Sequence, residues 1–280
     1  MKLGVFYERG IPPRFNPIYA AAFAQLEQRG VTVEVLFTEE QLIRLDQLRP
    51  DADLYLLKSD SELSLSLATA LECMGGRVLN SAAASQLAKN KILAAAVMAR
   101  AGISMPASYV SGHPAQMKLP LATMPLIFKP YRGYHGVGMQ ICEQSGALPA
   151  DTQTGLVFAQ HYLHQARRDI KLFVIGQQVF GVSKSYSENS YLEAGQVVEL
   201  SNEIVELALR CGAAFGMDLL GIDVAQDDDG YHVIDVNYLP GYRGVPDAAR
   251  LIADHIYKVM CTEASMVTTA PATKRSSTIN

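Results

Sequence analysis

Apolar positions in the first eighty residues change repeatedly between two spacings. Short apolar runs, typical of strands buried in a parallel sheet, alternate with stretches whose apolar residues recur at helical spacing. We predict strands at residues 3–7, 31–37, 53–58 and 77–79, and helices at 18–28, 39–48 and 63–74. This alternation predicts a small parallel α/β domain, which we end near Asn80.

Beyond Asn80 the pattern changes to a few helices separated by groups of strands. A glycine-rich stretch, residues 132–138, stands between two of the predicted strands. Because a strand follows the glycines, we expect a loop between antiparallel strands, whereas a Rossmann turn would open a helix. Residues 262–280 are rich in Thr, Ser and Ala, and we expect a disordered tail. We predict helices at 81–87, 90–101, 202–215 and 248–260, and strands at 126–130, 139–142, 156–161, 170–175, 178–184, 219–225 and 231–237.

Composition narrows the class of protein. The 280 residues are 49% hydrophobic and 19% charged, with 24 Lys and Arg against 28 Asp and Glu, a net charge of −4. These proportions are typical of a globular protein, and a slightly acidic chain is poorly suited to nucleic acid or anionic membranes. No apolar run is long enough to span a bilayer, and the N-terminal segment meets Glu8 and Arg9 too early for a signal peptide. Four distant cysteines without a CxxC pair favour reduced thiols, so we expect a cytoplasmic protein.

Three polar residues on the last two predicted strands suggest a metal site. Asp235 and Asn237 are two apart and therefore share a face of one strand, and Asp223 lies on the strand before it, across an Asp-Gly turn. Two carboxylates and an amide oxygen on adjacent strands suit Mg²⁺, which keeps other positions for water and phosphate oxygens. The alternative is that these residues are acids at strand ends that face solvent.

Two lysines stand where they could meet phosphate. Lys129 ends an apolar strand directly before the glycine-rich loop, whose backbone N–H groups could lie over an anion. Lys91 opens an Ala-rich helix, where a cation is unfavourable unless an anion is near. The alternatives are a purely structural glycine hairpin and solvated lysines.

These features, in this order, resemble the ATP-grasp superfamily from about Asn80 to Met260. The branch that it resembles most is the glutamate-ligase-like one, which includes ribosomal-protein-S6 modification enzymes, and the inositol-phosphate kinase branch comes second. The resemblance implies an α/β fold with α+β lobes: a Rossmann-like α/β domain (1–80), a central lobe with the glycine-rich loop (81–150), and a C-terminal lobe with the metal site (151–261). The resemblance is carried by Asn-Lys91, Phe-Lys129-Pro with the glycines, Gln160-His161-Tyr162-Leu163, Arg-Asp169-Ile-Lys171, Gly-Ile-Asp223-Val, and Val-Ile-Asp235-Val-Asn237 with Pro240-Gly241.

The resemblance also implies roles for the matching residues. Mg²⁺, with Mn²⁺ as an alternative, would be held between ATP phosphates by Asp223, Asp235 and Asn237. ATP would contact phosphate-binding residues, an adenine-binding segment and one acid: Lys91, Lys129, Gly133, Gly136, Gln160, His161, Tyr162, Leu163 and Asp169. Catalytic groups would be Lys171, His135 and Arg243, and substrate-binding groups would be Lys184, Arg168 and Arg132.

The acceptor decides between two enzymes. Lys171 and Asp235 stand where the ligases usually carry Arg and Glu, and both changes are similar to the inositol-phosphate kinases. A polyphosphate acceptor, however, needs many cations, and residues 183–196 offer only Lys184 beside Glu188 and Glu193. We therefore predict a ligase that joins a small-molecule or peptide carboxylate to an amine through an acylphosphate. The alternatives are an inositol-phosphate kinase and a non-catalytic nucleotide-binding protein, and the chain could also associate with itself.

Overall fold

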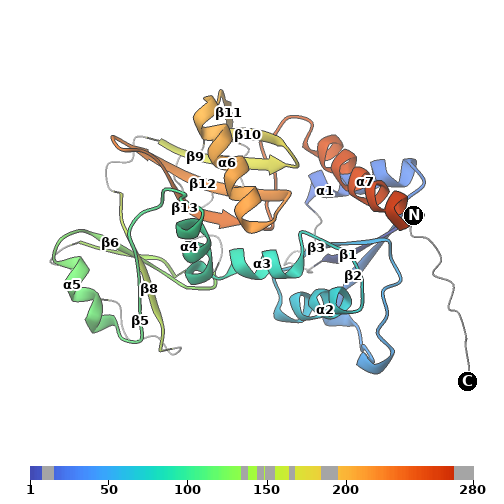
Figure 1. Ribbon diagram of the computed structural model, residues 1–280, viewed down its shortest axis with the longest axis horizontal. Helices are drawn as coiled ribbons and strands as arrows, with labels where there is room; N and C mark the ends of the chain where they lie inside the picture. The colour runs from blue at the N-terminus through green and yellow to red at the C-terminus, as the bar shows by residue number, and fades with distance from the viewer. Residues whose placement is uncertain are drawn as a thin grey trace, which may run out of the picture.

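The computed structural model describes residues 1–7, 16–133, 138–143, 148, 155–163, 168–183 and 195–267, and the statements below concern that part of the chain. Three β-sheets follow one another along the long axis of the molecule, with helices between and around them (Figure 1). We call them the N-terminal sheet (β1–β4), the distal sheet (β5–β8) and the C-terminal sheet (β9–β13), which lies between the other two. In the part of the chain described, no helix has both the length and the apolar character needed to cross a bilayer.

The N-terminal sheet is parallel, as the alternating pattern predicted. Its strand order is β2-β1-β3-β4, and all three strand pairs run parallel. Asn16 caps helix α1 by accepting from the N–H of Ile18, and Pro17 follows at the first helical position, where its missing N–H costs nothing. The elements are β1 (Lys2–Tyr7), α1 (Pro17–Gln28), β2 (Thr32–Phe37), β3 (Leu54–Lys58), α2 (Glu62–Cys73) and β4 (Val78–Leu79).

One helix prediction in this region is wrong. Residues 39–48 form no α-helix but two single turns of 3₁₀ helix, Thr38–Glu40 and Leu45–Gln47. The two apolar side chains that reach the core from this stretch are Ile43 and Leu48, five positions apart, whereas Leu42 and Leu45 are exposed. Residues five apart do not share a helix face, so an α-helix could not turn both Ile43 and Leu48 to this core.

The distal sheet is antiparallel and carries the glycine-rich loop. Its order is β5-β8-β6-β7, and the predicted antiparallel pair on either side of the glycines is β6 with β7. A short helix, α5 (Lys118–Leu121), covers a core made by this lobe alone. The pattern missed α5 because it is one turn long and contains Pro120. The strands are β5 (Ser108–Ser111), β6 (Leu126–Lys129), β7 (Gln140–Cys142) and β8 (Val157–His161).

The C-terminal sheet is antiparallel and is buried on both faces. Ile170, Leu172 and Val174 of β9 join a core with helices α3, α4 and α6, whereas Phe173 and Ile175 face a second core. That second core is shared with the N-terminal sheet, α1 and α7. Helix α7 continues to Val267, past the predicted end at Met260. The sheet order is β11-β10-β9-β12-β13, with elements α3 (Ala82–Lys89), α4 (Lys91–Arg100), β9 (Arg168–Ile175), β10 (Gln178–Ser183), β11 (Gln196–Val198), α6 (Asn202–Phe215), β12 (Leu219–Asp227), β13 (Gly230–Asn237) and α7 (Ala248–Val267).

A buried asparagine ties the N-terminal sheet to the C-terminal sheet. Asn80, directly after β4, donates from Nδ2 to the carbonyl of Leu219 (2.6 Å). Its Oδ1 accepts from the N–H groups of Asp218 (3.0 Å) and Leu219 (3.1 Å). Three hydrogen bonds from one buried side chain fix the start of β12 against the end of the parallel sheet.

Candidate functional site

Two carboxylates face each other across β12 and β13. Asp223 and Asp235 are direct partners in the antiparallel register, and Asn237 is opposite Gly221 on the same pair of strands. The register shifts beside Asp223, so that Val224 pairs with Val233 and Ile234 has no partner in β12. This β-bulge leaves the carbonyl of Ile234 free for a side chain from elsewhere. The predicted grouping of the three polar residues is therefore present, with a bulge that the sequence did not reveal.

Each carboxylate is paired with a lysine from a different element. Lys171 of β9 lies beside Asp223 in the register, and its Nζ is 2.8 Å from Asp223 Oδ1. Lys91, the first residue of α4, places its Nζ 2.8 Å from Asp235 Oδ1. Burial lowers the pKa of Lys171, but the carboxylates of Asp223 and Asp235 outweigh it, and the net shift is upward. Lys171 is therefore held firmly in its charged form.

Helix α4 begins where it does because of Asn90. The Asn90 Oδ1 accepts from the N–H of Ile92 (3.0 Å), which caps the helix and leaves Lys91 at its first position. The N–H of Lys91 donates to the carbonyl of Tyr131 (2.9 Å), at the start of the glycine-rich loop. A lysine at this end of a helix is unfavourable by itself, and the Asp235 carboxylate offsets that cost.

Lys129 is the third lysine near the two aspartates, and we call Lys91, Lys129, Lys171, Asp223, Asp235 and Asn237 the cluster. Among the described residues, Lys129 has no carboxylate partner within hydrogen-bonding distance. Its Nζ donates to Gln160 Oε1 (2.6 Å) and to the Ile234 carbonyl that the bulge exposes (3.1 Å). Burial lowers the pKa of Lys129 to about 8, and the positive charge of Lys91 adds to that shift, against the opposing effect of Asp235 and Asp223. Lys129 therefore joins the distal sheet to β13 through neutral partners and retains an unbalanced positive charge.

The donor set fits a magnesium ion. Asp223, Asp235 and Asn237 offer two carboxylates and an amide oxygen, and Asn237 Oδ1 also accepts from the N–H of Leu239 (2.8 Å), which fixes its orientation. Such a set leaves positions open for water and phosphate oxygens, as Mg²⁺ requires. Within the described ranges, no group of three or more His, Cys, Asp and Glu residues could hold a metal ion. A closed all-protein zinc site is therefore not built from these residues.

The predicted adenine-binding segment ends strand β8. Gln160 is buried, and its Nε2 donates to Ser108 Oγ (3.0 Å) while its Oε1 accepts from Lys129. The N–H groups of His161 and Tyr162 already donate to the carbonyls of Ala107 (2.8 Å) and Pro125 (2.9 Å). A nucleobase bound at this segment would therefore be recognised by the backbone carbonyl groups of the segment and by the backbone of Leu163.

The other predicted residues are distributed unevenly. Gly133 packs on Pro130, because an added Cβ would lie 3.1 Å from the Pro130 Cβ. Arg132 is paired with Glu62 of α2 (2.9 Å), away from the two aspartates, and Lys89 shares the same carboxylate. Arg243 is half-buried in the loop after β13. His135, Gly136 and Lys184 lie outside the described residues, as do the side chains of Arg168 and Asp169, whose backbones belong to β9.

Sequence reasoning missed two residues beside the cluster. Gly221 of β12 is closely surrounded, because a Cβ there would lie 3.3 Å from Pro240 Cβ and 3.7 Å from both Asn237 Cβ and Lys171 Cε. Lys58 ends β3, and its Nζ lies 3.3 Å from the Pro240 carbonyl. The signal for Lys58 was present in the chain, since a lysine that ends an apolar strand is the same pattern that singled out Lys129.

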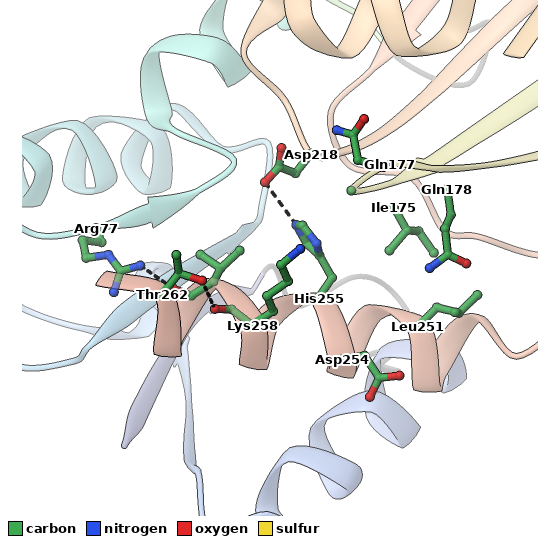
Figure 2. Close-up of a pocket in the computed structure, with 12 residues that line it drawn as sticks. Arg77, Ile175, Gln177, Gln178, Asp218, Leu251, Asp254, His255, Lys258 and Thr262 are labelled. Atoms are coloured by element: carbon green, nitrogen blue, oxygen red, sulfur yellow. Dashed lines mark hydrogen bonds and ion pairs between the residues drawn. The ribbon is translucent and has the colours of Figure 1, made fainter. Parts of the chain in front are cut away.

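A separate cavity of about 520 Å³ lies along α7, at the β9–β10 turn (Figure 2). His255 projects from α7 to Asp218, and the Nε2–Oδ2 distance is 3.1 Å. Arg77 and Lys258 are balanced by Asp218 and Asp254, so the formal charges of the lining cancel when His255 is neutral. None of the residues predicted for the site lines this cavity.

Comparison with known proteins identifies relatives of this chain. Residues 88–259 match the family model of the RimK-like ATP-grasp domain. A probable alpha-L-glutamate ligase of Haemophilus influenzae (strain ATCC 51907 / DSM 11121 / KW20 / Rd) is 27% identical over 257 residues, which cover 84% of this chain and 85% of that protein. A second one, from Vibrio vulnificus (strain YJ016), is 28% identical over 204 residues, covering 67% of this chain and 68% of that protein.

Solved structures share the fold at low sequence identity. The D-cycloserine synthetase DcsG superimposes with a TM-score of 0.72 at 14% identity, covering 93% of this chain and 100% of that one. A RimK domain ATP-grasp protein from Sphaerobacter thermophilus DSM 20745 gives a TM-score of 0.69 at 18% identity, covering 92% and 100%. The mixed α/β architecture predicted from the sequence is therefore confirmed as that of the ATP-grasp ligases.

Proposed function

The chain belongs to the RimK-like ATP-grasp family and is an ATP-dependent carboxylate–amine ligase, and from this premise we propose how its residues divide the reaction. One observation carries the proposal: Lys91, Lys129 and Lys171 converge from α4, β6 and β9 on the facing pair Asp223 and Asp235. Three cations and two acids at one place suit the binding of a nucleoside triphosphate together with a divalent cation.

The reaction proceeds in two steps. An oxygen of the substrate carboxylate attacks the γ-phosphorus of ATP, the bond from phosphorus to the ADP oxygen breaks, and an acylphosphate forms. The amine nitrogen then attacks the acyl carbon, the bond from that carbon to the phosphate oxygen breaks, and the proton lost by the amine goes to the departing phosphate as the amide forms. In both steps negative charge spreads over phosphoryl oxygens, so nearby fixed cations lower the barrier.

We assign Lys91 and Lys129 to the phosphates and Lys171 to the reacting phosphoryl group. In the described structure, Lys91 and Lys171 are neutralised by Asp235 and Asp223, whereas Lys129 is bound only by neutral groups. Binding of ATP would exchange the aspartates for phosphate oxygens as lysine partners. Asp223, Asp235 and Asn237 would then hold Mg²⁺, which neutralises phosphate charge when it is bound.

The ligase is better supported than a kinase. The family model describes a RimK-like domain, and the relatives in the comparison are named as probable glutamate ligases. Of the basic residues predicted to bind the substrate, Arg132 is already paired with Glu62, which leaves fewer cations for a polyphosphate acceptor. We infer that the two departures from the ligase pattern, Lys171 and Asp235, conserve charge type and serve the same reaction. The names of the relatives support glutamate as the first amine to test. The four cysteines, all within the described residues, form no disulfide with one another, which supports our proposal of a cytoplasmic location.

An acceptor screen with ADP detection tests this function. Wild-type protein, Mg–ATP and L-glutamate are combined with pools of small acids and of peptides, and each pool is repeated without the amine and with Mn²⁺ in place of Mg²⁺. We expect ADP and free phosphate only when acid and amine are both present, and mass spectrometry should find an amide product. Transfer of labelled γ-phosphate into a stable acceptor would instead identify a kinase.

A further inference from the structure

Lys58 is a basic residue that the mechanism above does not use. It ends β3, at the carboxyl edge of the parallel N-terminal sheet, and its Nζ lies 4.2 Å from the centre of the Tyr19 ring. The Pro240 carbonyl, at 3.3 Å, is its hydrogen-bond acceptor. Among the residues that the structure describes, no carboxylate pairs with it. Burial lowers the pKa of Lys58 to about 7.

The position of Lys58 connects it to the site. Pro240 follows Asn237 by three residues, and its ring packs on Gly221, against which Asn237 and Lys171 also lie. The next carbonyl, that of Gly241, accepts from Asn16 Nδ2 at 3.0 Å, so the turn is fixed from two sides. The Lys58 ammonium therefore borders the cluster from the side of the N-terminal sheet. Carboxyl edges of parallel strands are where α/β sheets commonly bind ligands.

We propose that Lys58 forms a carboxylate subsite, which binds a carboxylate of the amino-acid substrate that is not activated and remains in the product. The inference rests on the proposed ligase function. Within the described ranges the part-buried Lys58 ammonium has a carbonyl and an aromatic ring as partners and no counter-charge, which makes it an expensive structural contact. An incoming carboxylate would supply the missing counter-charge and a charge-assisted hydrogen bond. A subsite on the N-terminal sheet would also place the amine of the same molecule toward the reacting centre.

The competing explanation is that Lys58 only clamps the Pro240 turn to α1. A clamp would stabilise the fold but would not discriminate between an amino acid and its amide. The test therefore compares ligands as well as variants. The variants are Lys58→Met, which can still pack on Tyr19, Lys58→Arg, and the control Lys2→Met, which removes a lysine from the opposite edge of the same sheet.

Binding is measured first, by thermal shift with Mg²⁺ and a non-hydrolysable ATP analogue, across the proteinogenic amino acids and their α-amides. We expect at least one amino acid to stabilise wild type, Lys2→Met and, more weakly, Lys58→Arg, with at least tenfold weaker binding to Lys58→Met. The α-amide of that amino acid, or an analogue that lacks its side-chain carboxylate, should bind wild type and Lys58→Met equally weakly. Equal binding of the acid to wild type and Lys58→Met, or no binding of any amino acid to wild type, would overturn the assignment.

Steady-state kinetics separate this proposal from the ligase function. In Lys58→Met, KM for the amino acid should rise at least tenfold, while KM for ATP stays within twofold of wild type. If ADP release requires both acid and amine but KM for the amino acid is unchanged in Lys58→Met, the subsite is rejected and the ligase function stands. ADP release that never depends on an amine rejects the ligase itself.

Discussion

Replacing Lys129 with Met should abolish most activity while leaving the protein folded. The fall in the pKa of Lys129 from 10.5 to about 8 corresponds to about 3 kcal/mol against its charged form in the folded protein, at about 1.36 kcal/mol per pH unit. Methionine removes that penalty. It also leaves Gln160 Oε1 and the Ile234 carbonyl without their donor, at about 1–3 kcal/mol each. These effects oppose each other, so the net change in the free energy of unfolding should lie between a gain of about 1 kcal/mol and a loss of about 3 kcal/mol.

Activity should respond differently, because nothing replaces the lost cation beside the transferring phosphoryl group. We expect kcat to fall at least about a hundredfold, equivalent to about 2.7 kcal/mol of transition-state stabilisation. The assay is coupled ADP release with saturating Mg–ATP, beside thermal unfolding of the same samples. Lys118→Met, an exposed lysine of the same lobe, is the matched control. A rate within fivefold of wild type, or a loss of activity matched by a loss of folded protein, would refute the reasoning.

The same residue predicts a pH dependence with a defined sign. The pKa of Lys129 is lower in the folded state than in the unfolded state, so between pH 8 and 10.5 the unfolded chain binds more protons. The free energy of unfolding of wild type relative to Lys129→Met should therefore rise across this window. Denaturant titrations at pH 7.5, 9 and 10 measure the difference, and a flat or falling difference would contradict the burial of a charged Lys129.

Three further changes test other parts of the site and the fold. Asp235→Asn removes a metal-ligand charge and the partner of Lys91, so the Mg²⁺ concentration at half-maximal rate should rise at least tenfold with little change in circular dichroism; an unchanged Mg²⁺ titration would argue against the metal assignment. Gly221→Val should lower stability by about 1–3 kcal/mol and reduce kcat, because its side chain meets Pro240 and Lys171; Gly216→Ala, a helix C-cap glycine with open space around it, serves as the reference for a backbone effect alone. Asn80→Ala removes three buried hydrogen bonds and should lower the free energy of unfolding, measured in urea, by about 3 kcal/mol. The control, Asn90→Ala, removes a helix cap and should cost about 1 kcal/mol. Equal losses in the two variants would contradict the assignment of Asn80 as the tie between the two sheets.

The shared face of Asp235 and Asn237 could be predicted, because residues two apart on a strand point to the same side of the sheet. The facing of Asp223 and Asp235 does not follow from the turn, because the register that the turn sets, with Val224 opposite Val233, would place Asp223 opposite Ile234 if the strands were regular. The bulge at Ile234 could not be predicted, since nothing in Val-Ile-Asp-Val-Asn distinguishes a regular strand from one with an extra residue. The consequence was large, because the exposed Ile234 carbonyl is one of the two partners of Lys129.

Long-range pairings were the other part that the sequence did not reveal. Lys91 and Asp235 are 144 positions apart, and no local pattern connects them. The failed helix at 39–48 has the same origin, because whether Leu42 is buried depends on a core that other segments build. The strand pattern of Lys58 matches that of Lys129, but the motifs that carry the family resemblance lie after Asn80 and imply no role for Lys58.

The division of the hydrophobic cores bears on which part of the molecule can move or be exchanged. The N-terminal and C-terminal sheets share one core, so neither can swing without exposing side chains such as Phe173 and Leu3. The core of the distal sheet contains only residues of that lobe, and its contacts with β12 and β13 include the hydrogen bond from Lys129 to the Ile234 carbonyl. Hinged motion should therefore carry the distal lobe as a unit, and amide exchange should report its opening separately from the rest. A chimaera that imports this lobe from a relative has few interfaces to repair, whereas one that imports the first eighty residues has a whole core to rebuild.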